Sequence, residues 1–234
     1  MLLNYLKIAL RNLLRNPVYS FINITGLSVG LACTMLILVW VNHEVSFDRF
    51  HANADRIFQV WINGSYDGTV NSFQTVPFQT KDALKTEDSG IRNTALSAWP
   101  TIHLLANGET RINQTGQIVS DEFLDIFKFP FLSGSQEQPF ADPASVLLTE
   151  STARVLFGNS DPLGQIVLLD NKREVKVTGI LRDIPENSSF QFNFLLPIKL
   201  FEQDNWVQEG IDDWGHYNWL VYVELQSATA KDQV

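Results

Sequence analysis

The sequence predicts an α+β protein in which an N-terminal interfacial helix and one transmembrane helix precede a mixed α+β domain. Three observations support this prediction. Residues 18–41 contain no charged side chain, the charges on the two sides of that run differ in sign, and the rest of the chain alternates between strand-like and helix-like patterns. The expected division is a cytoplasmic amphipathic helix at 1–17, a transmembrane helix at 18–41 and an extracytoplasmic domain at 42–234.

The distribution of charge separates the first part of the chain from the rest. The chain has 234 residues, 45% of them hydrophobic, and a formal net charge of −9, although the only charges before residue 44 are Lys7, Arg11 and Arg15. The remainder is therefore strongly acidic. An acidic surface repels a phosphate backbone, which excludes nucleic-acid binding by the large domain. The length and hydrophobic content allow a sizeable core in one or two domains.

A helix over residues 18–41 is long enough to cross a membrane. At ~1.5 Å per residue it spans roughly 36 Å, whereas the hydrocarbon core of a bilayer is about 30 Å thick. The alternative is a buried helix of a soluble protein, but such helices rarely run so far without a charge. A cleaved signal peptide is disfavoured because the basic region is too long. Cys33, the single cysteine, excludes an intrachain disulfide and is expected to be a membrane-buried thiol, since Gly30 disrupts a lipidation signal.

The charges around this span predict its orientation. Glu44, Asp48 and Asp55 follow the span and outnumber Arg49 between residues 42 and 55, whereas every charge before the span is positive. By the positive-inside tendency, the N-terminus is cytoplasmic and the large domain lies on the other side.

Residues 2–16 have the pattern of a helix that lies in the membrane interface. Leucines recur at a spacing of three or four residues, and Lys7, Arg11 and Arg15 fall at i, i+4 and i+8 on another face, toward anionic lipid headgroups. Asn16-Pro17 ends this helix, because the residue before a proline is pushed out of the α region. A simple basic cluster beside the membrane gives the same charge pattern and is the alternative.

Two glycines inside the span predict contact with another helix. Gly26 and Gly30 form a G-x-x-x-G pattern, and small residues at this spacing let a second helix approach closely. We therefore expect Gly26 and Gly30 to be helix-packing residues.

The domain after residue 42 is expected to combine short strands and helices. Aromatic and β-branched runs predict the strands, and turn residues separate them. Asp121 and Thr149 stand where helix N-caps are expected, and Gly158 stands where the second of those helices ends. The expected strands are 56–63, 91–99, 111–119, 165–169, 174–181, 190–195 and 218–225; the helices are 77–87, 122–127, 150–157 and a short one from 197; the turns are 64–68 and 170–171.

The sequence contains no catalytic or metal-binding motif. A phosphate-binding loop of the G-x-x-x-x-G-K-[ST] type is missing, which excludes ATP hydrolysis by that route. His43-Glu44 lacks a second histidine four residues later, and a metal held by His43, Asp48 and His51 is a weak alternative. A G-x-S-x-G nucleophile turn is also missing. We therefore expect no catalytic, metal-binding or cofactor-binding residue and no enzyme activity.

Tryptophans are frequent in the outer domain. One interpretation is that they line a binding cleft, but tryptophans more often fill a core or an interface. They are Trp61, Trp99, Trp206, Trp214 and Trp219.

A series of short motifs spans most of the chain. After the basic helix and the span come E-x-S-F-D-x-F-H-x-N-A-D-R-I-F at 44–58, V-L-L-T-E at 146–150, L-F-G at 156–158, D-P-L-G at 161–164, V-T-G-I at 177–180 and D-I-P-E-N-S at 183–188. In this order they resemble ABC-transporter permeases of the MacB/FtsX-like type, particularly those of Bacteroidetes, with their periplasmic core domain. Individually the motifs are cap and turn signals, so no catalytic residue is carried over.

The resemblance implies a permease subunit in a bacterial inner membrane, with most of the chain in the periplasm. In that family a separate cytoplasmic ATPase drives a pair of permeases, and the periplasmic domain transmits the motion that exports a peptide, drug or lipid-linked substrate. The expected partners are the ATPase subunit, a second permease copy and membrane lipid, with a periplasmic adaptor as a further candidate. Family permeases have three further spans, so the chain is expected to be part of a longer one. The alternatives are a single-span sensor or scaffold that binds a protein or envelope component and, third, an extracytoplasmic enzyme.

Overall fold

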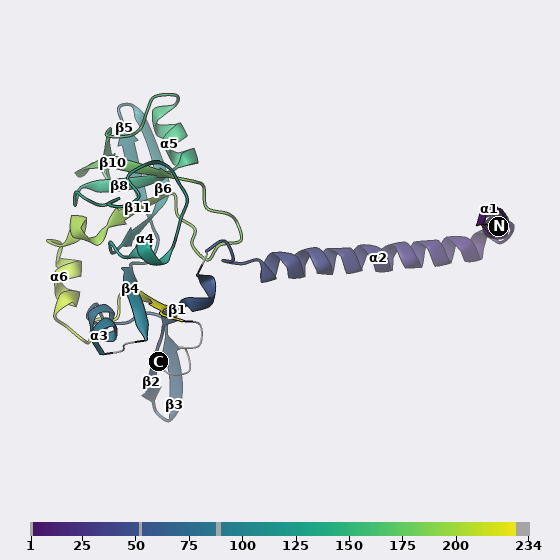
Figure 1. Cartoon of the computed structure of the whole chain (residues 1–234), viewed down its shortest axis with the longest axis horizontal. Coiled ribbons are helices and arrows are strands. Elements are labelled where there is room, and N and C mark those ends of the chain that lie inside the picture. Colours follow the sequence, from purple (N-terminus) through teal and green to yellow (C-terminus); the bar gives the residue numbers. More distant parts are fainter. Residues whose placement is uncertain (1, 52, 88–89, 228–234) are drawn as a thin grey trace. The chain divides into compact units, whose positions relative to one another are not determined.

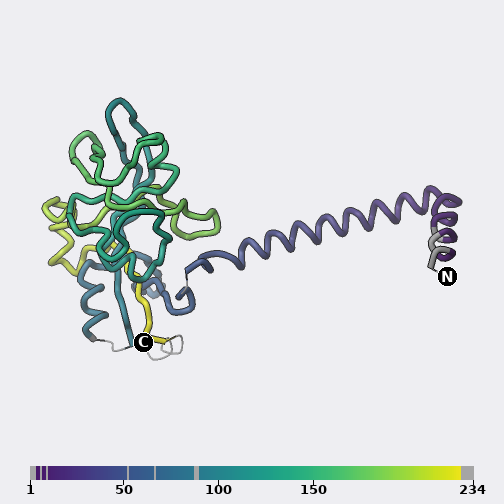
Figure 2. Tube along the Cα trace, turned by 45° about the horizontal axis from the view of Figure 1, so that its top comes forward, coloured from purple at the N-terminus to yellow at the C-terminus, as the bar shows by residue number. Residues whose placement is uncertain are grey.

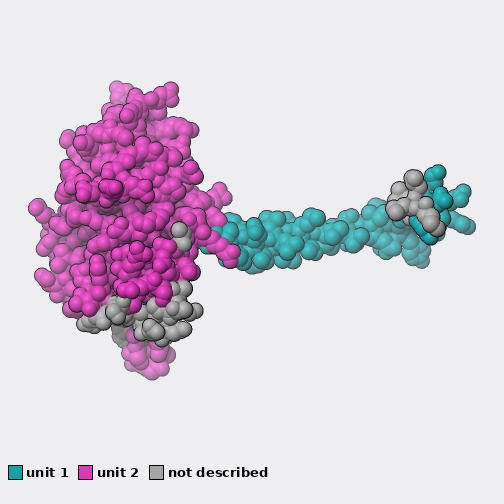
Figure 3. Space-filling view, viewed as in Figure 1, with its two compact units in different colours: residues 1–47 teal, residues 48–234 magenta. Residues whose placement is uncertain are grey.

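The computed structural model describes residues 2–51, 53–87 and 90–227 of the chain. The chain divides into two compact units, Met1–Phe47 and Asp48–Val234, which are coloured separately in Figure 3. Each unit has its own internal contacts and its own type of secondary structure.

The first unit consists of two helices. Helix α1 (Leu2–Arg15) ends at Asn16, whose φ of −126° and ψ of 68° lie outside the helical region, and α2 (Pro17–Val45) starts directly after it. Proline suits this position because the first turn of a helix does not need its missing N–H. Helix α2 continues without interruption to Val45 (Figures 1 and 2). In the part of the chain that the structure describes, α2 is the one helix long and apolar enough to cross a membrane.

The second unit is built on a mixed ten-stranded sheet and a separate two-stranded hairpin. The strands of the large sheet are β1 (Ile57–Val60), β4 (Ile91–Ser97), β5 (Thr101–Asn107), β6 (Thr110–Val119), β7 (Phe131–Gly134), β8 (Ser145–Thr149), β9 (Ile166–Leu169), β10 (Arg173–Leu181), β11 (Phe194–Pro197) and β12 (Leu220–Leu225). The hairpin consists of β2 (Ile62–Tyr66) and β3 (Thr69–Phe73).

Part of the large sheet closes on itself. The strands follow the order β6-β11-β8-β10-β9-β5, and β5 then pairs with β6 from Thr101↔Gly116 to Asn107↔Thr110. Closure leaves these strands without free edges. Strands β4, β12 and β1 extend the sheet beyond β6, and β7 pairs with β10. Gly116 is required here, because a Cβ at this position would lie 2.2 Å from the ring of Phe194.

Short helices cover the sheet and help to form two hydrophobic cores. The larger core includes aliphatic side chains from the closed part of the sheet, such as Leu105, Val146 and Val177, and extends to β4 and β12. The smaller core is rich in aromatic residues and is called the aromatic cluster below; its buried phenylalanines are Phe123, Phe127, Phe129, Phe140, Phe190 and Phe192. The helices are α3 (Thr80–Glu87), α4 (Phe123–Ile126), α5 (Glu150–Phe157), α6 (Asn205–Ile211) and the 3-10 turns η1 (Ala54–Arg56) and η2 (Ile198–Phe201).

The predicted α+β fold class is confirmed, with one candidate membrane helix before a mixed domain. The expected strands at 91–99, 111–119, 165–169 and 174–181 are observed as β4, β6, β9 and β10. Helix α5 follows Thr149 and ends at Gly158, whose φ of 61° is in the left-handed region that glycine tolerates. Asp170 and Asn171 form the predicted turn with φ values of 53° and 55°.

Several local predictions are wrong, and each error has a structural cause. Strand β5 was not expected after Pro100, but pairing with β6 along its whole length stabilises it. Gly64 lies within β2, and the turn follows at Asp67 and Gly68. Asp121 does not cap α4, because its carboxylate accepts a hydrogen bond from Lys199 and Glu122 is the N-cap residue.

Other boundaries differ because side chains have tertiary partners. Thr149 is the N-cap residue of α5, but its hydroxyl contacts the hydroxyl of Thr152 at 3.0 Å instead of a backbone amide. Helix α6 was not expected from the sequence. The strand expected from residue 190 begins at Phe194, since Phe190 and Phe192 pack into the aromatic cluster.

Candidate functional site

The segment that begins the second unit is the candidate functional site. It covers residues 48–56, with Ala52 outside the described residues, and is called the post-helix segment below. In the chain it follows Phe47 and leads through η1 into β1. Its side chains are held by three separate parts of the domain.

Asp48 attaches the start of the post-helix segment to a loop far away in the sequence. The Asp48 backbone N–H donates to the carbonyl of Asn187 at 3.0 Å. Its carboxylate accepts hydrogen bonds from the Ser189 N–H at 2.8 Å, from the Ser188 hydroxyl at 3.2 Å and from the Ser189 hydroxyl. Asp48 has a φ of 55°, a conformation that aspartate tolerates better than most residues. Charge-assisted bonds of this kind are stronger than neutral ones.

His51 inserts into the aromatic cluster. It is 4% exposed, and its ring centroid lies 4.0 Å from Phe50, 5.1 Å from Phe129 and 5.2 Å from Phe127. Neither ring nitrogen has a hydrogen-bond partner among the residues that the structure describes. Burial lowers the pKa of His51, although the charge of Asp48 acts in the opposite direction. His51 is therefore a neutral, buried ring that adds apolar contacts to the segment.

Tyr222 of β12 borders the same region. Its ring lies 5.1 Å from Phe127 and 5.5 Å from Phe190, and the side chains of Asp48, His51, Phe190 and Tyr222 line a common pocket. Burial, with a contribution from the charge of Asp48, raises the pKa of Tyr222 to about 12. The hydroxyl of Tyr222 is accordingly protonated at physiological pH.

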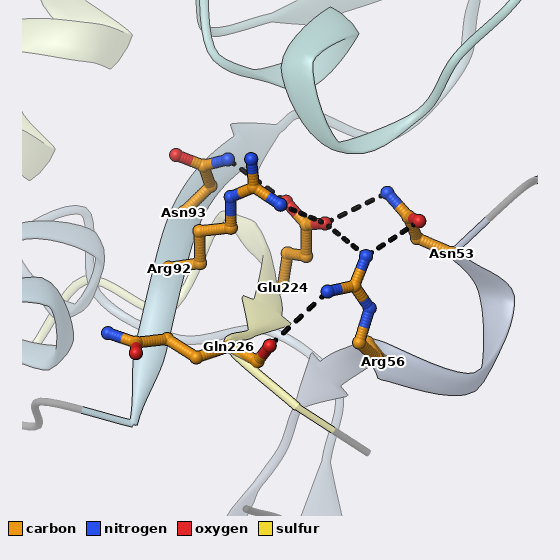
Figure 4. A network of polar contacts seen from close by, with 6 residues as sticks. All are labelled: Asn53, Arg56, Arg92, Asn93, Glu224 and Gln226. Atoms are coloured by element: carbon orange, nitrogen blue, oxygen red, sulfur yellow. Dashed lines mark hydrogen bonds and ion pairs between the residues drawn. The ribbon is translucent and has the colours of Figure 1, made fainter.

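Glu224 holds the end of the post-helix segment (Figure 4). It is only 1% exposed, yet it lies on β12 among residues of opposite charge or with amide donors. Its carboxylate accepts hydrogen bonds from the side-chain amides of Asn53 at 2.9 Å and Asn93 at 3.0 Å. Arg56 lies 3.5 Å away and Arg92 3.7 Å away. A buried carboxylate is stable only with such partners.

Arg56 connects this network to the end of β12. One guanidinium nitrogen donates to the side-chain oxygen of Asn53 at 2.7 Å, and another donates to the carbonyl of Gln226 at 3.3 Å. Figure 4 shows Arg56 between these two acceptors and Glu224. The planar guanidinium suits this arrangement, because it presents several donors in fixed directions. The post-helix segment is thus attached to a loop, to the aromatic cluster and to strand β12.

Comparison with known proteins identifies the family. The family model for MacB-like periplasmic core domains matches residues 20–234. The chain belongs to this family. No curated protein matches the chain significantly.

Three solved structures share the fold of this chain. A permease-protein domain from Porphyromonas gingivalis has a TM-score of 0.66 at 22% identity, over 80% of this chain and 81% of that one. The extracellular domain of the ABC-type transporter YknZ from Gram-positive bacteria has a TM-score of 0.52 at 18% identity, over 68% and 78%. The periplasmic region of MacB from Actinobacillus actinomycetemcomitans has a TM-score of 0.52 at 17% identity, over 76% and 80%. The resemblance to MacB/FtsX-like permeases is confirmed.

The structure gives the motif at residues 44–58 a physical meaning in this MacB-like domain. Asp48 binds the 187–189 loop, His51 fills a gap among phenylalanines, and Asn53 and Arg56 bind Glu224. Sequence reasoning missed Glu224 itself. A signal was present, because a carboxylate in the middle of the apolar strand L-V-Y-V-E-L must be paired if that strand is buried.

The residues predicted for the membrane part of this MacB-like protein lie on the two helices of the first unit. Lys7, Arg11 and Arg15 are exposed on α1. A Cβ added at Gly26 or Gly30 of α2 would have no neighbour within 4 Å, so both positions leave space for a second helix. Their roles at the membrane interface and in helix packing stay predictions. Among the described residues, no group of three or more His, Cys, Asp or Glu is placed to hold a metal ion.

A second polar cluster lies where β5 meets the turn after β9. The Nδ1 of His103 lies 2.7 Å from Asp170, and its Nε2 lies 2.7 Å from the hydroxyl of Thr101. Asp170 also accepts the N–H of Leu104 at 2.9 Å. Burial acts to raise the pKa of Asp170, but the hydrogen bonds from His103 and Leu104 outweigh it and lower that pKa. The hydroxyl, imidazole and carboxylate have the order of a hydrolase relay, and the bonds of Asp170 to Leu104 and His103 also connect the turn after β9 to β5.

Proposed function

We propose that this chain is a permease subunit of an ABC transporter that works by mechanotransmission. In this proposal a separate cytoplasmic subunit hydrolyses ATP, and the periplasmic domain moves in response and exports a peptide, drug or lipid-linked substrate. Membership of the MacB-like family and the apolar helix α2 support the proposal. The printed description of YknZ as an ABC-type transporter agrees with it.

The observation that carries the proposal is the attachment of the post-helix segment. Motion of a membrane helix reaches a following domain only if the first residues of that domain are fixed to it. Here those residues are fixed by the charge-assisted bonds of Asp48 and by the buried carboxylate of Glu224. Removing one partner from a buried ion pair typically costs about 3–5 kcal/mol, so such an attachment resists a pull better than a flexible linker does.

The proposed topology follows from the charges of the first unit. Lys7, Arg11 and Arg15 would lie at the cytoplasmic face of the inner membrane beside anionic headgroups, with the MacB-like domain in the periplasm. Gly26 and Gly30 would pack against another membrane helix, either from the same permease or from a second copy in a dimer. A periplasmic adaptor is a further proposed partner.

Copurification tests the proposed partner. The full-length protein, extracted from its native membrane in mild detergent, is expected to carry a nucleotide-hydrolysing subunit with it. The measurements are the rate of ATP hydrolysis by the purified complex and the identification of the copurified subunit by mass spectrometry. Purified protein that repeatedly lacks any nucleotide-hydrolysing subunit would contradict the proposal and favour the single-span sensor or scaffold.

A distance measurement tests mechanotransmission. In a Cys33→Ser background, a spin label at Val155→Cys, which is 55% exposed on α5, reports the distance between two copies in the complex. We expect this distance to differ between the nucleotide-free and ATP-bound states, and we expect Glu224→Gln to abolish the difference. Glu150→Gln, at a surface ion pair with Arg154, is the matched control and should leave it unchanged. If the distance still changed with nucleotide in Glu224→Gln, motion would not be transmitted through the buried carboxylate of Glu224.

A further inference from the structure

An exposed apolar surface lies away from the post-helix segment, where two stretches of chain run antiparallel. Val76 and Trp219 form an isolated bridge, in which the N–H of each donates to the carbonyl of the other at 2.8 and 3.3 Å. This bridge brings residues 73–79 beside residues 211–219. The surface that results, called the loop surface below, consists of the exposed rings of Phe73, Trp214 and Tyr217 and the half-buried side chains of Ile62, Phe78 and Ile211.

The loop surface contains two hollows that share the same pair of stretches. One is lined by Phe73 and Tyr217 together with Ile62 of the β2–β3 hairpin. The other is lined by Phe78 and Trp214 with part of α3. Trp214 is 57% exposed and Tyr217 is 46% exposed, although most of the surface of each large ring is apolar. Exposed apolar patches of this kind mark interaction sites more often than chance exposure does.

The base of the loop surface is firmly held. The side-chain amide of Gln79 donates to the carbonyl of Ile211 at 2.5 Å, and the Phe78 ring packs edge-on against Trp219 at 5.5 Å. Trp219 is fully buried and stacks on Trp206 at 5.4 Å. The domain therefore has room for tryptophan in its core, whereas Trp214 lies at the surface in a loop whose two flanking residues, Ile211 and Trp219, are bonded to residues 76–79. A preformed surface loses little conformational entropy on binding.

The charge around the loop surface indicates which kind of partner it binds. Exposed carboxylates accompany it on α3, on α6 and in the 211–217 loop, and they belong to Asp82, Glu209, Asp212 and Asp213. Lys85 is an exposed cation on α3, and Lys81 lies 3.0 Å from Glu122 and 3.7 Å from Asp82. Therefore Glu209, Asp212 and Asp213 are the carboxylates that give the border its negative charge. This acidic border repels anionic lipid and a second copy of the same surface, and it attracts a basic partner.

We propose that the loop surface binds a basic, amphipathic segment of a partner protein. Apolar side chains of that segment would occupy the two hollows beside Trp214 and Tyr217. Its lysines or arginines would lie against the carboxylates of Asp212 and Glu209. The two kinds of side chain contribute differently to binding. The rings supply affinity, and the carboxylates supply orientation and a faster association rate.

Binding of designed peptides to the full chain in zwitterionic nanodiscs tests the proposal. The probe is a synthetic lysine/leucine amphipathic helix, and its matched control is the same peptide with glutamate in place of lysine. We expect the basic peptide to bind and the acidic one not to bind. Trp214→Ala should weaken binding about tenfold or more, as loss of a tryptophan at the centre of an interface commonly does. Trp99→Ala, at a tryptophan that is 49% exposed between β4 and β5, should leave it unchanged.

The charge variants complete the test. Asp212→Asn with Glu209→Gln should weaken binding several-fold and reduce its dependence on salt. Equal binding by Trp214→Ala and Trp99→Ala, or salt dependence that the charge variants do not alter, would overturn the proposal. Self-association of the chain that requires Trp214 would also overturn it, in favour of a second copy as the occupant. None of these outcomes bears on copurification with an ATPase, so the proposed permease function is tested separately.

Discussion

The post-helix segment and the loop surface differ in which side chains they bury and expose. The first depends on a buried charged group, and the second presents an exposed aromatic ring. In the first, the carboxylate of Glu224 is buried and surrounded by Asn53, Arg56 and Asn93. In the second, the ring of Trp214 is exposed on the loop between Ile211 and Trp219. A buried polar group needs every one of its partners, whereas an exposed ring needs none within the chain. Substitutions in the two regions should therefore affect different properties, stability in one and binding in the other.

The largest effect is expected at the buried carboxylate. Glu224→Ala removes the acceptor of two side-chain amides and leaves Arg56 without its buried counter-charge. We expect the free energy of unfolding to fall by about 3 kcal/mol, at the lower end for a broken buried ion pair because Arg56 can regain some water. Urea denaturation measured by circular dichroism gives this value. Glu150→Ala on α5 is the control, and a loss of equal size there would contradict the comparison.

A smaller loss is expected at the start of the post-helix segment. Asp48→Asn keeps a side chain that tolerates a φ of 55° but removes the charge that strengthens the bonds from Ser188 and Ser189. We expect a loss of about 1–2 kcal/mol in the free energy of unfolding. Hydrogen exchange of the Ser189 amide should accelerate at the same time. Unchanged protection of that amide would show that the carboxylate does not hold the loop.

The sequence predicted some parts of this comparison well and others poorly. Helices α2 and α5 were predicted from local signals. An uncharged apolar run is sufficient for α2, and a glycine directly after the last turn marks the end of α5. Strand β5 was missed because its stability comes from pairing with β6 and β9, which no local pattern reveals. Glu224 carries a local signal, a carboxylate within an apolar strand, but its partners are distant in the sequence, next to and within η1 and on β4, so the network itself could not be predicted. The tryptophans were noticed, but only the fold separates the buried Trp219 from the exposed Trp214.

His51 makes the stability of the post-helix segment depend on pH. Burial lowers its pKa in the folded state below the ordinary value of 6.5, so the unfolded chain takes up a proton first as the pH falls. Its contribution to stability is complete above pH 6.5 and is lost progressively as the pH drops below that value. The titratable groups that line the same pocket are the charged carboxylate of Asp48 and, on β12, the neutral hydroxyl of Tyr222.

Urea midpoints between pH 5 and pH 8 measure this dependence. His51→Phe keeps a ring among the phenylalanines and removes the titrating group, so its stability should vary less over this range than that of the natural protein. Asp170 provides a contrast, because its pKa in the folded state is lowered from the ordinary value of 3.8. Its contribution to stability is therefore complete above pH 3.8 and is lost only as the pH falls below that value. Identical pH profiles for the natural protein and His51→Phe would contradict the assignment.

The smallest effect on stability is expected on the loop surface. Trp214→Ala removes a ring that is more than half exposed, and substitutions at exposed positions usually change the free energy of unfolding by less than about 0.5 kcal/mol. The same variant is expected to lose most of its affinity for a basic amphipathic peptide. A stable protein with impaired binding is the reverse of the result expected for Glu224→Ala, where the free energy of unfolding falls. If Trp214→Ala instead lowered the urea midpoint as much as Glu224→Ala does, the ring would have to be structural, and the exposed surface would not be a binding site in its own right.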